Sequence, residues 1–248
     1  MRMLIFWTLM VGLFSILPAQ RGFKVGFFGV PQVSFLMNED DRSLAADQYS
    51  PEALPTMAGG ISLGVGFTDN FGLRFSPTLA QQGQAYTALT EGDITTRFVE
   101  RLNYFKLPLM IGFNTTPTAR KFIYSLYLGA SVDLLTQARS FNDNPFFFIP
   151  SNVSIPPARD RYLDLAYSFI AETGFDVQLP PENFTLNLRL RGDYGLTDVE
   201  NKDVTYRVVT NGQVETFRYW GNLRGENRTA VTQALNLGLL IGLTYAFE

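Results

Sequence analysis

Histidine and cysteine are both absent from the 248-residue chain. Histidine is the usual general base of hydrolytic sites, and histidine and cysteine are the commonest ligands of zinc and haem. Their absence excludes a Ser-His-Asp type of site and thiol chemistry, so we expect neither an enzyme nor a bound cofactor or metal. Without disulfides, a closed network of backbone hydrogen bonds or a core must stabilise the fold.

Charge and long apolar runs are also scarce. Only 17% of the residues are charged, the net charge is −3, and no run rich in lysine or arginine is present, which argues against nucleic acid as a partner. Beyond Gln20 no segment approaches the roughly 20 apolar residues that a membrane-spanning helix needs. Any insertion into a membrane must therefore use strands.

The N-terminus is the one segment with a long apolar run. Arg2 provides a positive charge, an apolar stretch covers residues 4–17, and Pro18-Ala19-Gln20 offers the small residue that a signal peptidase needs. The apolar stretch is too short for a membrane anchor. The sequence predicts a signal peptide over residues 1–20 and a single mature domain over residues 21–248 of an exported protein.

Alternation with a period of two dominates the rest of the chain. Between Met57 and Phe67, for example, large apolar residues alternate with glycine, alanine and serine. This pattern is typical of strands whose two faces meet different surroundings. It predicts eight strands over residues 23–37, 57–67, 71–79, 105–113, 122–134, 163–179, 184–194 and 231–247.

The predicted connections alternate in length. Those over residues 68–70, 115–120 and 180–183 are short, and those over residues 38–56, 84–95, 136–160 and 197–228 are long. An even number of strands with this asymmetry predicts an all-β fold, an eight-stranded antiparallel up-and-down transmembrane β-barrel. Short turns and both termini are then periplasmic, the long loops are extracellular, and membrane lipid is a partner.

Side-chain volume decides which face of this barrel points outward. An eight-stranded barrel has just enough interior for small side chains to fill, so a face rich in Phe, Leu and Ile must point out into lipid. Alternation alone also permits a secreted lipocalin-like barrel, the soluble alternative. The opposite face is polar and carries a predicted structural charge network in the lumen: Arg74, Lys106, Asp133, Asp164, Glu172, Asp176, Arg189, Arg191 and Asp193.

This charge network has two interpretations. Paired carboxylates can carry out acid–base chemistry. Buried charges are, however, retained mostly as hydrogen-bonded ion pairs. We favour ion pairing, which fills the lumen and leaves no catalytic residues.

Two features of the predicted loops are candidates for binding. The apolar cluster Phe146, Phe147 and Phe148 either contacts a partner or packs as a lid over the barrel mouth. Asn211-Gly212 lies between two β-prone segments and predicts a type I′ hairpin that extends the last loop and could pair with another protein.

Three short segments resemble the PorT-like outer-membrane β-barrel family of Bacteroidetes-type bacteria. They are Tyr104 to Leu109, Asp193 to Asp198 and the closing segment Leu237 to Phe247. The resemblance implies an outer-membrane location and a porin-family barrel fold in the envelope of a Gram-negative bacterium. Named members of the family are implicated in protein secretion.

Three functions remain as hypotheses. The first is a non-enzymatic structural or scaffolding barrel of the cell envelope, linked to secretion by the resemblance and to an envelope protein through its extracellular loops or periplasmic turns. The second is a narrow pore for small solutes. The third is the secreted lipocalin-like binding protein.

Overall fold

The structure is a computed structural model, described here for residues 22–38, 49–90, 94–115, 122–142, 153–154, 157–181, 183–210, 213–218 and 230–247. The predicted signal peptide, residues 1–20, lies outside the described residues, as does the cluster Phe146 to Phe148. Within these ranges no helix has the length and apolar character to cross a membrane.

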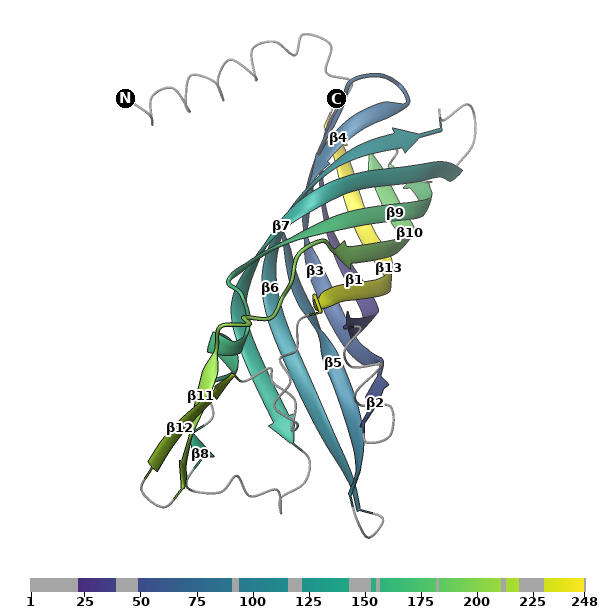
Figure 1. The fold of residues 1–248 in the computed structure, drawn as a ribbon. Coiled ribbons are helices and arrows are strands. Elements are labelled where there is room, and N and C mark those ends of the chain that lie inside the picture. Colours follow the sequence, from purple (N-terminus) through teal and green to yellow (C-terminus); the bar gives the residue numbers. More distant parts are fainter. Residues whose placement is uncertain are drawn as a thin grey trace, which may run out of the picture.

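Long antiparallel strands make up nearly all of the described chain (Figure 1). The strands of the large sheet are β1 (Phe23–Met37), β2 (Tyr49–Glu52), β3 (Leu54–Gly66), β4 (Phe71–Phe75), β5 (Thr78–Thr90), β6 (Ile94–Asn114), β7 (Phe122–Asn142), β9 (Leu165–Leu179), β10 (Phe184–Gly195) and β13 (Gln233–Phe247). A small second sheet contains β8 (Val153–Ser154), β11 (Thr205–Thr210) and β12 (Gln213–Arg218). The 3₁₀ helix η1 (Ala158–Arg161) precedes β9.

The strand pairings of the large sheet form a ring. β1 pairs with β13 on one side and with β3 on the other. β3 continues to β4 and β5, these to β6, and the ring runs on through β7, β9 and β10 back to β13. β4 and β5 both lie between β3 and β6 and together form one strand position of the ring. The barrel therefore has eight strand positions, as predicted.

The two faces of the barrel differ as the volume argument requires. Large apolar side chains such as Phe27, Leu79 and Ile111 are exposed on the outside, with 64 to 67% of their surface accessible. The inward positions are buried and hold serine, threonine, small apolar residues and charges. This arrangement is that of a barrel facing lipid, because a lipocalin-like barrel would carry its large apolar side chains inside.

Several strands are longer than the alternation predicts. β5 continues to Thr90 and β6 begins at Ile94. Most of the predicted loop 84–95 is therefore a paired hairpin. β7 likewise extends to Asn142, into the predicted loop 136–160. A β-bulge causes part of this difference: Asn103 pairs with Gln137 but Tyr104 pairs with Leu135, so Thr136 is an extra residue that shifts the alternation.

The short and long connections lie at opposite ends of the barrel. In Figure 1 the β3–β4 turn and the C-terminal end of β13 lie at one end, and β2, β11 and β12 lie at the other. We call these the turn end and the loop end. The predicted hairpin around Asn211-Gly212 is present as the β11–β12 pair, and the two turn residues themselves lie outside the described residues.

Candidate functional site

The strand period places eight of the nine predicted lumen charges at buried inward positions. Each of these eight residues has 8% or less of its surface accessible: Arg74, Lys106, Asp133, Glu172, Asp176, Arg189, Arg191 and Asp193. They come from β4, β6, β7, β9 and β10, so five places in the ring contribute to one interior. We call them the lumen network.

Glu172 is the centre of the larger part of this network. Its carboxylate contacts the guanidinium of Arg74, and it lies 3.2 Å from Arg191 and 3.5 Å from Arg189. Arg189 also binds Asp176, with 2.7 Å between Nη2 and Oδ2. Arg74 and Arg189 additionally lie against the ring of Tyr127, with 4.0 and 4.5 Å from each Cζ to the ring centroid. These contacts hold the Tyr127 ring next to two cations.

Lys106 is the centre of the smaller part. Its Nζ lies 2.6 Å from Asp193 and 3.0 Å from Asp133, and the hydroxyl of Ser131 donates to Asp133 at 2.5 Å. Arg191 and Asp193 are two residues apart on β10 and share its inward face, so the two parts of the network are neighbours.

The charges of the lumen network balance. The Glu172 part holds three arginines and two carboxylates, a sum of +1, and the Lys106 part holds one lysine and two carboxylates, a sum of −1. Isolated charges in such a place would cost several kcal/mol each, at roughly the scale found for buried ions. Balance and direct pairing offset this cost.

Asp164 does not join this network, which corrects its predicted place. Its side chain is 80% exposed and pairs with Arg159 of η1. The residue has the inward parity of β9 but precedes the first residue of that strand, Leu165. The predicted strand 163–179 thus begins two residues before β9 does.

An apolar cluster fills the barrel above the lumen network at the loop end. It joins inward residues of the barrel strands to Tyr162 and Val199, which come from the connections: Leu36, Leu102, Tyr104, Leu135, Tyr162, Ala166, Val199 and Ala234. Leu163 donates its backbone N–H to Val199, which donates to Thr232. We call this cluster the loop-end plug. The alternation does not predict this cluster, because Tyr162 and Val199 lie outside the regular strands.

Polar contacts hold the plug in place. Arg161 is 3.2 Å from Glu100 of β6, and the Tyr162 hydroxyl donates to the same carboxylate at 3.2 Å. Burial raises the pKa of Tyr162 well above its ordinary value, and the negative charge of Glu100 acts in the same direction while Arg161 opposes it. Tyr162 therefore stays neutral and hydrogen-bonded at physiological pH.

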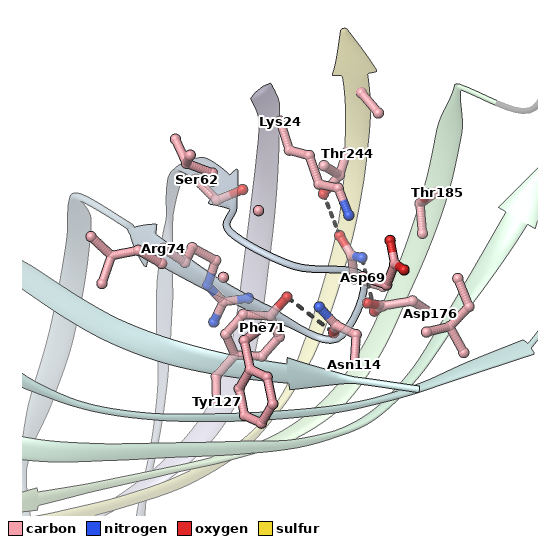
Figure 2. A pocket seen from close by; sticks show the side chains of 18 of the residues that line it. Lys24, Ser62, Asp69, Phe71, Arg74, Asn114, Tyr127, Asp176, Thr185 and Thr244 are labelled. Atoms are coloured by element: carbon pink, nitrogen blue, oxygen red, sulfur yellow. Dashed lines mark hydrogen bonds between the residues drawn. The ribbon is translucent and has the colours of Figure 1, made fainter. Parts of the chain in front are cut away.

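The turn end, in contrast, contains a pocket of about 430 Å³ (Figure 2). Lys24, Asp69 and Asn114 are among its lining residues, together with the buried side chains of Arg74, Tyr127 and Asp176. Asn187 donates to Asp176 at 2.9 Å and accepts from Thr244 at 2.7 Å. The lumen is thus a polar recess that opens at the turn end and is closed by charges and then by apolar side chains.

The described residues contain no group of three or more acidic side chains placed to hold a metal ion. Each lumen carboxylate instead has at least one oxygen paired with an arginine or lysine. The arrangement can hold the barrel shut and bind polar groups at the turn end.

Fold and lumen together define a transmembrane β-barrel of the outer-membrane type. The family model described as "Outer membrane protein beta-barrel domain" matches residues 14–201, so the chain belongs to that family. The match begins inside the predicted signal peptide and ends before β13.

Solved outer-membrane barrels are similar in fold at low sequence identity. OprG from Pseudomonas aeruginosa is 12% identical, covers 92% of this chain and 97% of its own, and has a TM-score of 0.45. Neisserial surface protein A is 13% identical over 91% and 97% of the two chains, with a TM-score of 0.37. Ail of Yersinia pestis is 11% identical over 91% and 99%, also with 0.37. No curated protein matches the chain in sequence.

Proposed function

We propose that this outer-membrane barrel is a non-enzymatic structural component of the cell envelope, with a closed lumen and with its loop end as a scaffold for an envelope protein. The observation that carries the proposal is the filling of the lumen. The balanced lumen network and the loop-end plug occupy successive levels of the same barrel. A barrel filled in this way supports an anchoring role better than solute passage.

The length of β6 and β7 supports the scaffolding role. Each has 21 residues, whereas a tilted strand needs roughly 9 to 11 residues to span a membrane. The surplus continues beyond the barrel, paired as far as Phe98 and Asn142, and β2 joins it through β5. This paired extension offers a sheet surface beyond the membrane on which a binding site can be built.

Planar-bilayer conductance tests the closed lumen against a narrow pore. We expect the full-length mature protein to insert without steady ion channels. Heat-modifiable migration of the protein recovered from the same membranes shows that insertion took place. Steady channels in the unchanged protein would contradict the proposal and favour the pore.

The orientation of the barrel in the membrane can be tested with single introduced cysteines, because the chain has no cysteine of its own. We propose that the turn end and both termini are periplasmic and that the loop end is extracellular. Val214→Cys on β12 should then react in intact cells with a membrane-impermeant maleimide, and Asp69→Cys in the β3–β4 turn should react only after permeabilisation. The reverse labelling would overturn the orientation.

Co-purification tests the scaffolding role. Crosslinking in native membranes followed by detergent extraction should recover an envelope protein with the barrel, and aspartate at the exposed pair Val209 and Val214 should reduce the recovery. Arg207→Gln, on the same hairpin, is the matched control. If the barrel always emerges alone and its deletion leaves every envelope complex intact, the scaffold proposal is wrong. Membership of the narrower PorT-like family, and with it a link to protein secretion, stays a prediction. Recovery of a secretion component as the crosslinked partner would support it.

A further inference from the structure

The outer surface of the β6–β7 hairpin carries two arginines side by side. Arg101 and Arg139 are directly paired across the two strands, and both are exposed. Their neighbours on β6, Glu100 and Leu102, belong to the plug region, and Leu102 is fully buried in the plug. Since side chains alternate along a strand and paired residues share a face, both arginines point away from the lumen.

Like charges directly opposite each other destabilise a sheet. Within the described part of the chain, neither arginine has a carboxylate within ion-pair distance. By comparison, Arg97 on the same strand is paired with Glu52 at 3.5 Å. The arrangement of Arg101 and Arg139 is therefore unfavourable for the protein alone and becomes favourable when an anion lies between them.

The position of the pair along the strands indicates where that anion comes from. Going along β6 toward the loop end, the outward residues are Phe113, Ile111, Leu109, Leu107 and Phe105, and then the pattern changes to Asn103 and Arg101. On β7 the same change occurs after Leu134, with Gln137 and Arg139. The arginines are thus the first charges beyond the apolar belt on both strands.

The height agrees with the thickness of a membrane. Twelve residues separate Phe113, whose ring packs against Phe71 at 5.3 Å, from Arg101. At a rise of about 3.3 Å per residue and a tilt of about 45°, they span roughly 28 Å across the membrane, close to the ~25 Å of a typical apolar band. If Phe113 marks one border of the belt, Arg101 lies at the other, at the level of lipid headgroups.

Neighbouring side chains complete a site for a phosphate. The Asn103 side-chain amide donates to Oε1 of Gln137 at 3.2 Å, which leaves the side-chain N–H groups of Gln137 as donors for a ligand. The Phe141 ring lies 5.9 Å from the Arg101 guanidinium, on the side away from the belt. Arginine guanidiniums bind phosphate through paired, charge-assisted hydrogen bonds.

We propose that Arg101 and Arg139 bind the phosphate of a membrane lipid headgroup at the loop-end border of the apolar belt. Acyl chains of the same lipid lie along the outward residues Phe105 and Leu134, and Gln137 adds a neutral donor. The site is on the outside of the barrel and is independent of the closed lumen and of any protein partner.

Native mass spectrometry of the full mature protein in neutral detergent tests the proposal. Three probes are added in turn: phosphatidylglycerol, a phosphate-free galactosyl diacylglycerol with the same acyl chains, and inorganic phosphate alone. We expect bound phosphatidylglycerol, with affinity reduced roughly tenfold or more by Arg101→Gln with Arg139→Gln, as for the loss of charge-assisted hydrogen bonds. Arg97→Gln, on the same strand but already paired with Glu52, should leave binding unchanged.

Each other outcome overturns the proposal. Equal binding of the galactolipid would show that acyl chains alone are recognised. Binding of inorganic phosphate as tight as that of the lipid would show an anion site without lipid recognition. Equal loss with Arg97→Gln would show a general charge effect.

Stability gives a second, independent readout. In neutral detergent, Arg139→Gln removes a like-charge contact, so its unfolding midpoint should stay the same or rise. In vesicles that contain phosphatidylglycerol, the same variant should unfold at a lower midpoint than the unchanged protein. A change of equal sign in both media would contradict the assignment.

Discussion

Lys106 of β6 and Asp193 of β10 meet across the lumen with 2.6 Å between Nζ and Oδ2, although 87 residues separate them in the chain. Asp133 of β7 approaches the same ammonium group at 3.0 Å. One lysine therefore compensates two buried carboxylates, and both depend on it.

Replacing Lys106 should consequently destabilise the barrel strongly. Lys106→Met leaves Asp133 and Asp193 buried without their cation, and removing one partner of a buried ion pair costs about 3 to 5 kcal/mol. Urea unfolding in lipid vesicles, followed by heat-modifiable migration, measures the loss.

Two variants serve as comparisons for Lys106→Met. Asp193→Asn should cost less, because Lys106 keeps Asp133. Lys24→Met should cost almost nothing, because Lys24 is exposed at the turn end and has no ion pair within the described chain. Equal stability of the Lys106 and Lys24 variants would show that the lumen network does not hold the strands together.

The loop-end plug predicts a different effect of truncation. Leu102 is fully buried between Leu36, Leu135 and Val199, so Leu102→Ala should leave a cavity and cost about 2 to 5 kcal/mol. Leu109→Ala on the same strand faces outward with 51% of its surface accessible and should cost less. A reversed order in urea unfolding would mean that the plug is not packed as described.

Much of this molecule can be predicted from the period of two. Residues with a strict alternation, such as Lys106 and Arg189, are placed correctly on the inside because a closed sheet has only two faces. The eight strands and the two kinds of connection follow from the same pattern.

Other features depend on contacts that a local pattern does not contain. Thr136 is an extra residue in a bulge of β7, so the alternation changes phase there and the end of β7 could not be recognised. Asp164 follows the phase of β9 but lies before it. Tyr162 and Val199 enter the barrel from connections, and only the folded chain brings them to Leu36 and Leu102.

Alkaline pH should weaken the loop-end plug through Tyr162. Its pKa is raised in the folded protein by burial and by Glu100, so the folded state keeps the proton at a pH where the unfolded state has lost it. The stabilising contribution is fully present below about pH 10, the ordinary value of tyrosine, and is lost as pH rises through the folded value. Unfolding of the unchanged protein and of Tyr162→Phe, compared between pH 8 and pH 12, isolates this contribution.

We expect the stability of the unchanged protein to fall more steeply above pH 10 than that of Tyr162→Phe. The variant keeps the ring in the plug and loses the hydroxyl that donates to Glu100, so it should be somewhat less stable at pH 8. Parallel curves would show that Tyr162 titrates normally and that its burial is not maintained.

Gly112 allows β6 to lie close to the Tyr127 ring, because glycine has no Cβ. The two residues are directly paired, and a Cβ at Gly112 would lie 2.2 Å from Cε1 of Tyr127. Gly112→Ala must therefore displace the ring from Arg74 and Arg189, and overpacking of this kind costs about 1 to 3 kcal/mol. Gly29→Ala is the matched control, because a Cβ there meets nothing within 4 Å.

A double variant distinguishes the steric contact between residue 112 and the Tyr127 ring from a general effect on stability of replacing a glycine. Tyr127→Ser makes room beside Gly112, so Gly112→Ala should cost clearly less in that background than in the unchanged protein. A thermodynamic cycle from urea unfolding gives the coupling between the two positions. Additive effects would mean that the cost of Gly112→Ala arises in the backbone and that the Tyr127 ring does not require a glycine beside it.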